Sequence, residues 1–504
     1  MNRTIALVLA LGLAGCPKPT GIDVAAQTPA SDGLPERPEA IAFPDLSFDA
    51  PKAEDYRLEL SSGVPVYLST STEFPLVDIS LTFRGGRYLD PVEHIGVGDL
   101  LGIVLRTGGT AEMAPAAFDE RLEFLATDLS VSVGSTRSYA GLNTLKDNLD
   151  ESLDMLGALL RTPGMDADRV RLAQDNWLES MKQRNDDASD IAAREWAALM
   201  YGADHYLARE ATIAHLEAID EAALRAAHGR IFHPGNLVIR VSGDVTAEEI
   251  LPRLEAMVDG WEVGETAPDI PVPQETGPVG LFHVQKDIPQ GKVRIGIRSV
   301  TRDDPDAIAI ELMNDILGGG GFTSRITKRV RSDEGLAYSA GSAFRSSPWF
   351  PGTLEARYES KNETVALAAK IVLDEFARIA ESPVSEEELA TAKGSFIEAF
   401  PRRFASRSGT LDVFVDDALT NRPEDYWQTW RDKVSALTAE DLTRVAKRVL
   451  RSEELTILVV GDWEPIAAGN ERANMQDVWS GEVTHLPLRD PLTMEPVADG
   501  KDVE

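Results

Sequence analysis

Residues 219–250 and 437–466 carry the same pattern of hydrophobic and polar positions, without a gap between corresponding residues. Each stretch starts with hydrophobic residues at helical spacing behind a polar residue, Asp220 or Thr438, and continues into an alternating strand that ends in Gly-Asp. The matching hydrophobic positions are Leu224 and Leu442, Ile231 and Val449, Leu237 and Leu455, Ile239 and Ile457, and Val241 and Val459. Agreement over this length indicates an internal duplication.

Earlier segments of the two copies also correspond, although with gaps. Alternating residues predict strands at 77–86 and 293–300, and each strand leads into a helix. Longer helices are predicted at 168–186, 307–317 and 385–400. Because strands and helices do not alternate strictly, the pattern favours an α+β fold with two tandem homologous domains, each a mostly antiparallel sheet with helices packed on one face.

Proline-rich stretches divide the chain. Prolines recur through residues 17–51 and again through 264–278, which is typical of tethers and linkers. The predicted divisions are a signal peptide (1–16), a disordered tether (17–51), an N-terminal domain (52–263), a linker (264–278), a C-terminal domain (279–470) and a tail (471–504), of which "QDVWSGEV" is expected to pack on the body and the last dozen residues to be frayed.

The first sixteen residues have the pattern of an export signal. Arg3 precedes an apolar run from Ile5 to Ala14, which is too short to span a bilayer. The run ends in Leu-Ala-Gly-Cys16, which resembles the lipobox of bacterial lipoproteins, where the cysteine becomes acylated. The alternative is an ordinary signal peptide with a chance cysteine. The resemblance implies an exported lipoprotein held in the cell envelope, on the periplasmic face of the outer membrane.

The composition of the chain narrows the range of functions and metal sites that it could have. A formal charge of −33 over 504 residues disfavours binding to nucleic acids, whose phosphates would be repelled. Cys16 is the sole cysteine, so no intramolecular disulfide or thiolate zinc site can form. The seven histidines form no pair three or four residues apart, so the sequence offers no helical histidine metal site.

Several motifs together resemble the pitrilysin/insulinase-type zinc peptidases, particularly their processing-peptidase-like members. These motifs are "FRGGRYLDP" (83–91), "GVGDLLGIVLRTGGT" (96–110), "HPGNLVIRVSGD" (233–244), "KDIPQGKVRIGI" (286–297) and "LGGGGFTSRITKRVRSDEGLAYSAGSAF" (317–344). The resemblance covers nearly all of residues 55–470. Active members of that family carry a His-x-x-Glu-His helix, in which two histidines hold zinc and the glutamate accepts a proton from the metal-bound water.

In this chain the helix has lost that chemistry. Asp99 and Ile103 stand where the resemblance places the histidines, and Gly102 stands where it places the glutamate. A further ligand of the family, a glutamate on a later helix, would correspond to Glu179, which is otherwise a surface residue of the predicted helix 168–186. Two carboxylates at best cannot make the three-ligand site of a catalytic zinc, so the prediction is no metal and no catalytic residue on this chain.

The second half keeps the family's substrate-binding pair. "RSDEGLAY" supplies Arg331 and Tyr338 at the required spacing, and the resemblance implies that they hold the carbonyl groups of a bound peptide. The alternative is a solvated arginine and a half-buried strand tyrosine. "GGGG" (318–321) could approach a peptide backbone or could simply end the preceding helix.

These features predict a non-catalytic, substrate-gripping subunit of a heteromeric zinc endopeptidase acting on peptides or unfolded proteins. The expected partners are a homologous zinc-bearing subunit, the substrate and, through the lipid, a membrane. One alternative is a structural or peptide-binding lipoprotein without a proteolytic role. A second is an active single-chain metallopeptidase with a divergent site.

Overall fold

The computed structural model describes residues 47–274 and 276–497, and the described residues from Asp49 onward form one compact unit. The predicted signal peptide and most of the tether lie outside the described residues, so the structure does not bear on them. Among the helices that are described, none has the length and apolar character needed to cross a bilayer.

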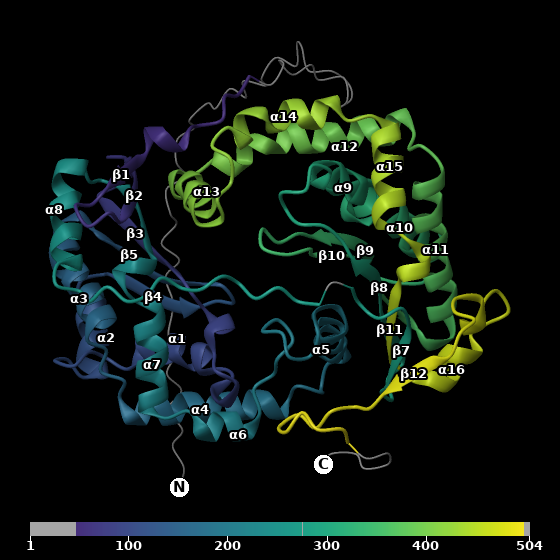
Figure 1. The fold of residues 1–504 in the computed structure, drawn as a ribbon, viewed down its shortest axis with the longest axis horizontal. Coiled ribbons are helices and arrows are strands. Elements are labelled where there is room, and N and C mark those ends of the chain that lie inside the picture. The colour runs from purple at the N-terminus through teal and green to yellow at the C-terminus, as the bar shows by residue number, and fades with distance from the viewer. Residues whose placement is uncertain (1–46, 275, 498–504) are drawn as a thin grey trace, which may run out of the picture. The chain divides into compact units, whose positions relative to one another are not determined.

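The first half forms a mixed, mostly antiparallel sheet (Figure 1). The strand order is β1-β2-β6-β3-β5-β4, in which β2 and β6 run parallel and the other neighbours antiparallel. The strands are β1 (Arg57–Glu59), β2 (Pro65–Thr70), β3 (Leu76–Arg84), β4 (Asp128–Val133), β5 (Arg137–Leu145) and β6 (Leu237–Gly243).

The second half repeats this arrangement in the order β12-β7-β11-β8-β10-β9. Here β7 runs parallel to both β11 and β12, and the remaining pairs are antiparallel. The strands are β7 (Gly280–Gln285), β8 (Gln290–Arg298), β9 (Ala340–Arg345), β10 (Thr353–Lys361), β11 (Thr456–Gly461) and β12 (Val483–Leu486). The predicted α+β fold with two similar halves is confirmed.

Helices cover both sheets. In the first half they are α1 (Val97–Thr107), α2 (Pro115–Phe124), α3 (Leu149–Arg161), α4 (Ala167–Lys182), α5 (Ala188–Tyr201), α6 (Ile213–Ala218), α7 (Glu221–Ile231) and α8 (Ala247–Val258). In the second half they are α9 (Ala307–Asn314), α10 (Arg325–Thr327), α11 (Val365–Glu381), α12 (Glu386–Ala399), α13 (Arg407–Thr420), α14 (Tyr426–Ala436), α15 (Ala439–Val449) and α16 (Trp463–Ala468). The predicted helix 307–317 instead ends its α-helical part at Asn314 and continues as a π-helical turn, Asp315–Gly319.

The duplicated pattern places the same local structures in both halves. Asp220 accepts a hydrogen bond from the N–H of Ala223 at the start of α7. Thr438 forms a reciprocal capping box with Asp441 at the start of α15. Each helix is followed by a central strand, β6 or β11, whose alternate residues face the main core of that half.

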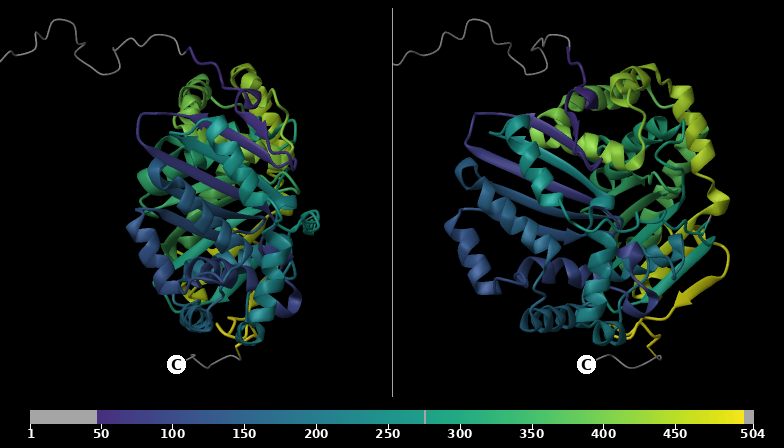
Figure 2. Two further views of the ribbon diagram at one scale, coloured as in Figure 1. Left: turned by 90° about the vertical axis from the view of Figure 1, so that its left-hand side faces the viewer. Right: turned by 60° about the vertical axis from the view of Figure 1, so that its left-hand side comes forward.

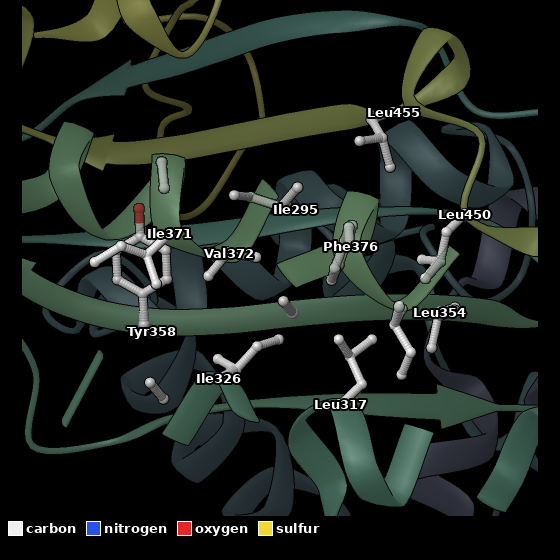
Figure 3. Close-up of a cluster of buried hydrophobic side chains, with 14 of the residues drawn as sticks. Ile295, Leu317, Ile326, Leu354, Tyr358, Ile371, Val372, Phe376, Leu450 and Leu455 are labelled. Carbon is white, nitrogen blue, oxygen red and sulfur yellow. The ribbon is translucent and has the colours of Figure 1, made fainter. Parts of the chain in front are cut away.

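The second-half core lies between its sheet and α9, α11 and α15 (Figure 3). Val372 and Phe376 of α11 pack over Ile295 and Leu354 of the sheet. Tyr358 is almost completely buried, and its hydroxyl donates to the carbonyl of Val365 at 2.8 Å, so the polar atom within this apolar cluster is satisfied.

Each sheet is also covered on its opposite face by a helix from the other half. On β11, Leu458 and Val460 point away from the main core and pack with Trp196 and Met200 of α5. In the reverse direction, α13 packs Leu411 and Phe414, among others, against β2 and β6 of the first sheet. The two halves therefore exchange one helix each, and Figure 1 shows α13 beside the first sheet and α5 beside the second.

Ion pairs reinforce this exchange. Arg240 of β6 contacts Asp78 of β3 at 2.7 Å and Asp412 of α13 at 2.9 Å. Arg137 of β5 contacts Asp416 of α13 at 2.6 Å. Both arginine side chains are largely buried, so these pairs are less screened by solvent than surface pairs.

Candidate functional site

Helix α1, on which the family places its metal site, is firmly anchored at its start. The Asp90 carboxylate accepts hydrogen bonds from the backbone N–H groups of Gly96, at 2.9 Å, and Gly98, at 3.2 Å. Burial raises the pKa of Asp90 to about 7, although these hydrogen bonds favour the charged form and oppose the rise. Asp90 thus serves as a cap that fixes the first turn of α1.

Asp99, Gly102 and Ile103, which stand where the family carries its metal-site residues, each have different neighbours in the structure. Asp99 pairs with Arg87 at 3.5 Å; burial raises the pKa of Asp99, and the guanidinium partly offsets that rise. Ile103 is 49% exposed and borders a cavity. Gly102 is pressed against β4, because a Cβ atom added there would lie 3.0 Å from the backbone nitrogen of Val133. A cationic side chain thus accompanies Asp99, and neither neighbouring position offers a donor atom to a metal.

A cavity of about 510 Å³ lies beside these residues, between α1, α4 and the segment before α6. Charged side chains of both signs line it together with the aromatic rings of Trp177 and Tyr206. Among its lining residues, Arg184 faces Glu210 at 3.6 Å. The full lining is Arg87, Asp90, Ile95, Gly96, Asp99, Ile103, Ala173, Asn176, Trp177, Ser180, Arg184, Tyr206, Leu207, Arg209, Glu210 and Ala211.

Glu179 is absent from this lining. It lies on α4, but its carboxylate pairs with Lys182 at 2.7 Å and is 64% exposed. The residues of α4 that border the cavity include Asn176 and Ser180 instead. The Glu179 carboxylate therefore lies outside the lining of the cavity that Asp99 borders. Across residues 47–274 and 276–497, no group of three or more potential metal ligands occurs.

Arg331 and Tyr338 are brought together. Arg331 lies on a π-helical turn, Lys328–Asp333, and Tyr338 lies just before β9. The centre of the Arg331 guanidinium is 4.8 Å from the centre of the Tyr338 ring, within the range of a cation–π contact. Tyr338 is 80% exposed, which differs from the half-buried strand tyrosine of the alternative interpretation.

Phe322 completes this cluster and was missed by the sequence reasoning. Its ring centre lies 4.5 Å from the Arg331 guanidinium, and the side chain is 67% exposed. Arg331 thus stacks with two exposed aromatic rings. The available signal was an aromatic residue directly after the glycine run 318–321.

That glycine run has a structural role. A Cβ atom on Gly318 would lie 2.4 Å from the backbone nitrogen of Ser342 in β9, so the π-helical turn Asp315–Gly319 can approach the strand only with glycine at this position. The run accordingly ends the preceding helix and sets the start of the loop that carries Phe322.

Known peptidase-like proteins are similar in sequence to this chain. A sequence profile described as the peptidase M16 inactive domain matches residues 218–396. The chain is 25% identical over 404 residues to a Helicobacter pylori protein named "Non-peptidase homolog YmxG", a match covering 79% of this chain and 92% of the relative. It is 26% identical over 388 residues to an uncharacterized zinc protease of Mycobacterium tuberculosis, covering 72% and 87% respectively.

The chain is similar to members of the M16 peptidase family over most of its length, and its residues 218–396 match the profile of that family's inactive domain. The predicted resemblance to pitrilysin/insulinase-type peptidases is thereby confirmed. The altered α1 helix of this chain accords with the relative named as a non-peptidase, and together with the inactive-domain match it supports a non-catalytic, peptidase-like role.

Solved structures share the fold. The peptidase M16 inactive domain from Pseudomonas fluorescens superposes with a TM-score of 0.71 at 23% identity, covering 81% of this chain and 98% of that chain. A chain of Complex III2 from Candida albicans superposes with a TM-score of 0.64 at 16% identity, covering 81% and 96%. At these identities the likeness concerns the fold alone.

Proposed function

We propose that this protein is the substrate-gripping subunit of a heteromeric zinc endopeptidase that acts on peptides or unfolded proteins. The observation that carries the proposal is the Arg331 guanidinium, which stacks with the exposed rings of Phe322 and Tyr338. Zinc and the proton-accepting glutamate would come from a homologous partner, because Gly102 and Ile103 supply neither.

The chemistry of the cluster suits a peptide. None of the ion pairs among the described residues involves Arg331, so its N–H donors are available to carbonyl oxygens. Stacking restricts the guanidinium to a few orientations before a ligand arrives, which lowers the entropy lost on binding. The phenol of Tyr338 adds a further donor beside it.

Replacing Arg331 with alanine tests the proposal. The chain is purified together with a homologue that carries an intact His-x-x-Glu-His motif, and cleavage of an unfolded peptide is measured. Arg331→Ala is expected to lower kcat/KM by ~10- to 100-fold, the effect of removing one or two charged hydrogen bonds. Lys328→Ala is the matched control, because Lys328 is an exposed cation one helical turn earlier and should change the rate little.

Two other results would favour the alternatives. Equal rates for the wild type and Arg331→Ala, with no stable association with a zinc-bearing homologue, would indicate a structural or peptide-binding protein. Stoichiometric zinc in the isolated chain, together with chelator-sensitive hydrolysis, would indicate an active single-chain peptidase.

We further propose that the protein is an exported lipoprotein of the outer membrane, acylated on Cys16. The support is the apolar run before Leu-Ala-Gly-Cys16 in the sequence. Cys16→Ala is expected to abolish incorporation of labelled palmitate and to move the protein from the membrane fraction to the soluble fraction, since acyl chains supply the anchorage. An unchanged membrane fraction for Cys16→Ala would overturn the assignment.

A further inference from the structure

The C-terminal segment 483–497, here called the strap, connects the two halves. It begins as β12, which pairs parallel with β7 at the edge of the second sheet. It then crosses to the first half, where the N–H of Ile213, at the start of α6, donates to the carbonyl of Leu492 at 2.8 Å. Figures 1 and 2 show this yellow segment running from β12 to the blue helices of the first half.

Side chains fasten the strap to the exchanged helix α5 and to the loop before it. The Arg489 guanidinium contacts the Glu195 carboxylate of α5 at 3.0 Å, and the Glu195 side chain is only 4% exposed. The Asn185 side-chain amide donates to the carbonyl of Arg489 at 2.8 Å. Because the Glu195 carboxylate is buried, removing Arg489 would cost more than removing one partner of a solvated surface pair.

The strap is folded rather than frayed, so the predicted fraying of the last dozen residues is wrong for the part that the structure describes. The N–H of Asp490 donates to the carbonyl of Glu495, and the N–H of Val497 donates to that of Leu488, both at 2.8 Å. The Asp490 carboxylate also accepts from the backbone N–H of Leu492 and of Thr493. These bonds shape the loop that meets the first half.

A histidine pair fixes the other end of the strap. The Nε2 of His283 in β7 lies 3.0 Å from the carbonyl oxygen of Gly461, so it carries the proton and donates. The Nδ1 of the neutral His283 ring is then an acceptor, and the Nδ1 of His485 in β12, 2.9 Å away, must donate to it. This contact holds β12 in register with β7.

The strap also reaches the cavity beside α1. Arg184 lines that cavity, and its guanidinium donates to the carbonyl of Pro491 at 3.2 Å and to that of Ala211 at 2.6 Å. Release of the strap would remove the contact with Pro491 and leave the Ala211 carbonyl and the Glu210 carboxylate, which lies 3.6 Å from Arg184. The strap therefore supplies one of the three contacts that position Arg184 in the cavity.

At the corresponding edges of the two sheets, the outermost strands come from opposite ends of the chain. In the first sheet the outermost strand beside β2 is β1, which precedes it in the sequence; in the second sheet the outermost strand beside β7 is β12, which comes from the C-terminal tail. Each terminal segment also touches an exchanged helix: Ala53 and Tyr56 pack with α13, as the strap binds α5.

From this arrangement we propose that the strap helps to hold the two halves of the protein at a fixed separation. It holds α5 on the second sheet while joining it to the first half, and so helps to fix the separation of the halves and the position of Arg184. Without it, the remaining connections between the halves would include the 264–278 linker, the two exchanged helices, the pairs Arg240–Asp412 and Arg137–Asp416, and the hydrogen bond from Lys286 to the carbonyl of Asn185. The proposal does not depend on the proposed function.

The test compares a chain ending at Glu482 with one ending at Val497. In a Cys16→Ser background, dyes on Glu123→Cys of α2 and Glu381→Cys of α11, both exposed positions, report the separation of the halves by energy transfer. Hydrogen exchange of α5 amides reports its docking. Loss of the strap should broaden the distribution of dye-to-dye distances and increase its mean. It should also speed hydrogen exchange of the α5 amides by about tenfold, the effect expected when one or two tertiary contacts are lost.

A variant of the full-length chain tests the same contact in case the shortened chain misfolds. Arg489→Ala removes the contact with Glu195 and should speed α5 exchange in the same direction. Arg472→Ala is its matched control, because Arg472 pairs with Glu334 at 2.6 Å within the second half and should leave α5 unchanged. An unchanged dye distance on truncation, together with unchanged α5 exchange in Arg489→Ala, would overturn the proposal.

Discussion

Gly102→Glu is expected to lower the free energy of unfolding of the first half by ~1–3 kcal/mol and to restore no activity. The glycine lies where an active relative would carry its proton acceptor, but here α1 lies so close to β4 that even a Cβ atom would sit 3.0 Å from the Val133 backbone nitrogen. A glutamate would force the helix away from the strand. Urea unfolding followed by circular dichroism measures the loss.

Gly102→Ala is the matched control. It adds only the Cβ atom, and the gain in helix propensity of ~1 kcal/mol over glycine offsets much of the tight contact. Its unfolding midpoint should therefore stay near that of the wild type. If Gly102→Glu were as stable as Gly102→Ala, then β4 could move aside to accommodate the larger side chain, and the expected loss of stability would be wrong.

The full motif, made as Asp99→His, Gly102→Glu and Ile103→His together, should also fail to hydrolyse peptides. Two histidines would still lack their further ligand, since the Glu179 carboxylate pairs with Lys182 outside the cavity. Chelator-sensitive hydrolysis by this triple variant, with one bound zinc per chain, would contradict the present account of the site.

Local pattern predicted much of the fold. The duplicated helix and strand of each half, the capping residues Asp220 and Thr438, and the α+β class all follow from spacing that neighbouring residues determine. The lack of metal-donor atoms in the side chains of Gly102 and Ile103 follows from the sequence itself, because an aliphatic side chain and a glycine have none wherever they lie.

Features that depend on long-range packing could not be predicted in this way. The resemblance left open whether Glu179 is a relic metal ligand or a surface residue of its helix, and only the structure shows that its side chain is 64% exposed and paired with Lys182. The stacking of Phe322 on Arg331 needs two π-helical turns, which helical periodicity does not signal. The exchange of α5 and α13 joins residues that are hundreds of positions apart, so it is visible only in three dimensions.

The turn that carries Arg331 depends on a buried charge nearby. Glu375 of α11 is completely buried, and its carboxylate accepts a hydrogen bond from Arg329 at 2.9 Å, two residues before Arg331. Arg378 lies farther from the same oxygen, at 3.7 Å. The other carboxylate oxygen of Glu375 has no hydrogen-bond partner among the described residues, so within that part of the chain Arg329 donates the hydrogen bond to this carboxylate while Arg325 and Arg378 add nearby positive charge.

Arg329→Ala is therefore expected to destabilise the second half by ~3–5 kcal/mol, the cost of leaving a buried charge without its partner. Arg378→Ala is the control: its side chain is 65% exposed, and its removal should cost no more than ~1 kcal/mol. In the double variant Arg329→Met with Glu375→Met, both charges are replaced by apolar groups of similar length, and stability should largely return. If urea unfolding gave Arg329→Ala and Arg378→Ala the same midpoint, the burial of Glu375 would not be what holds this turn.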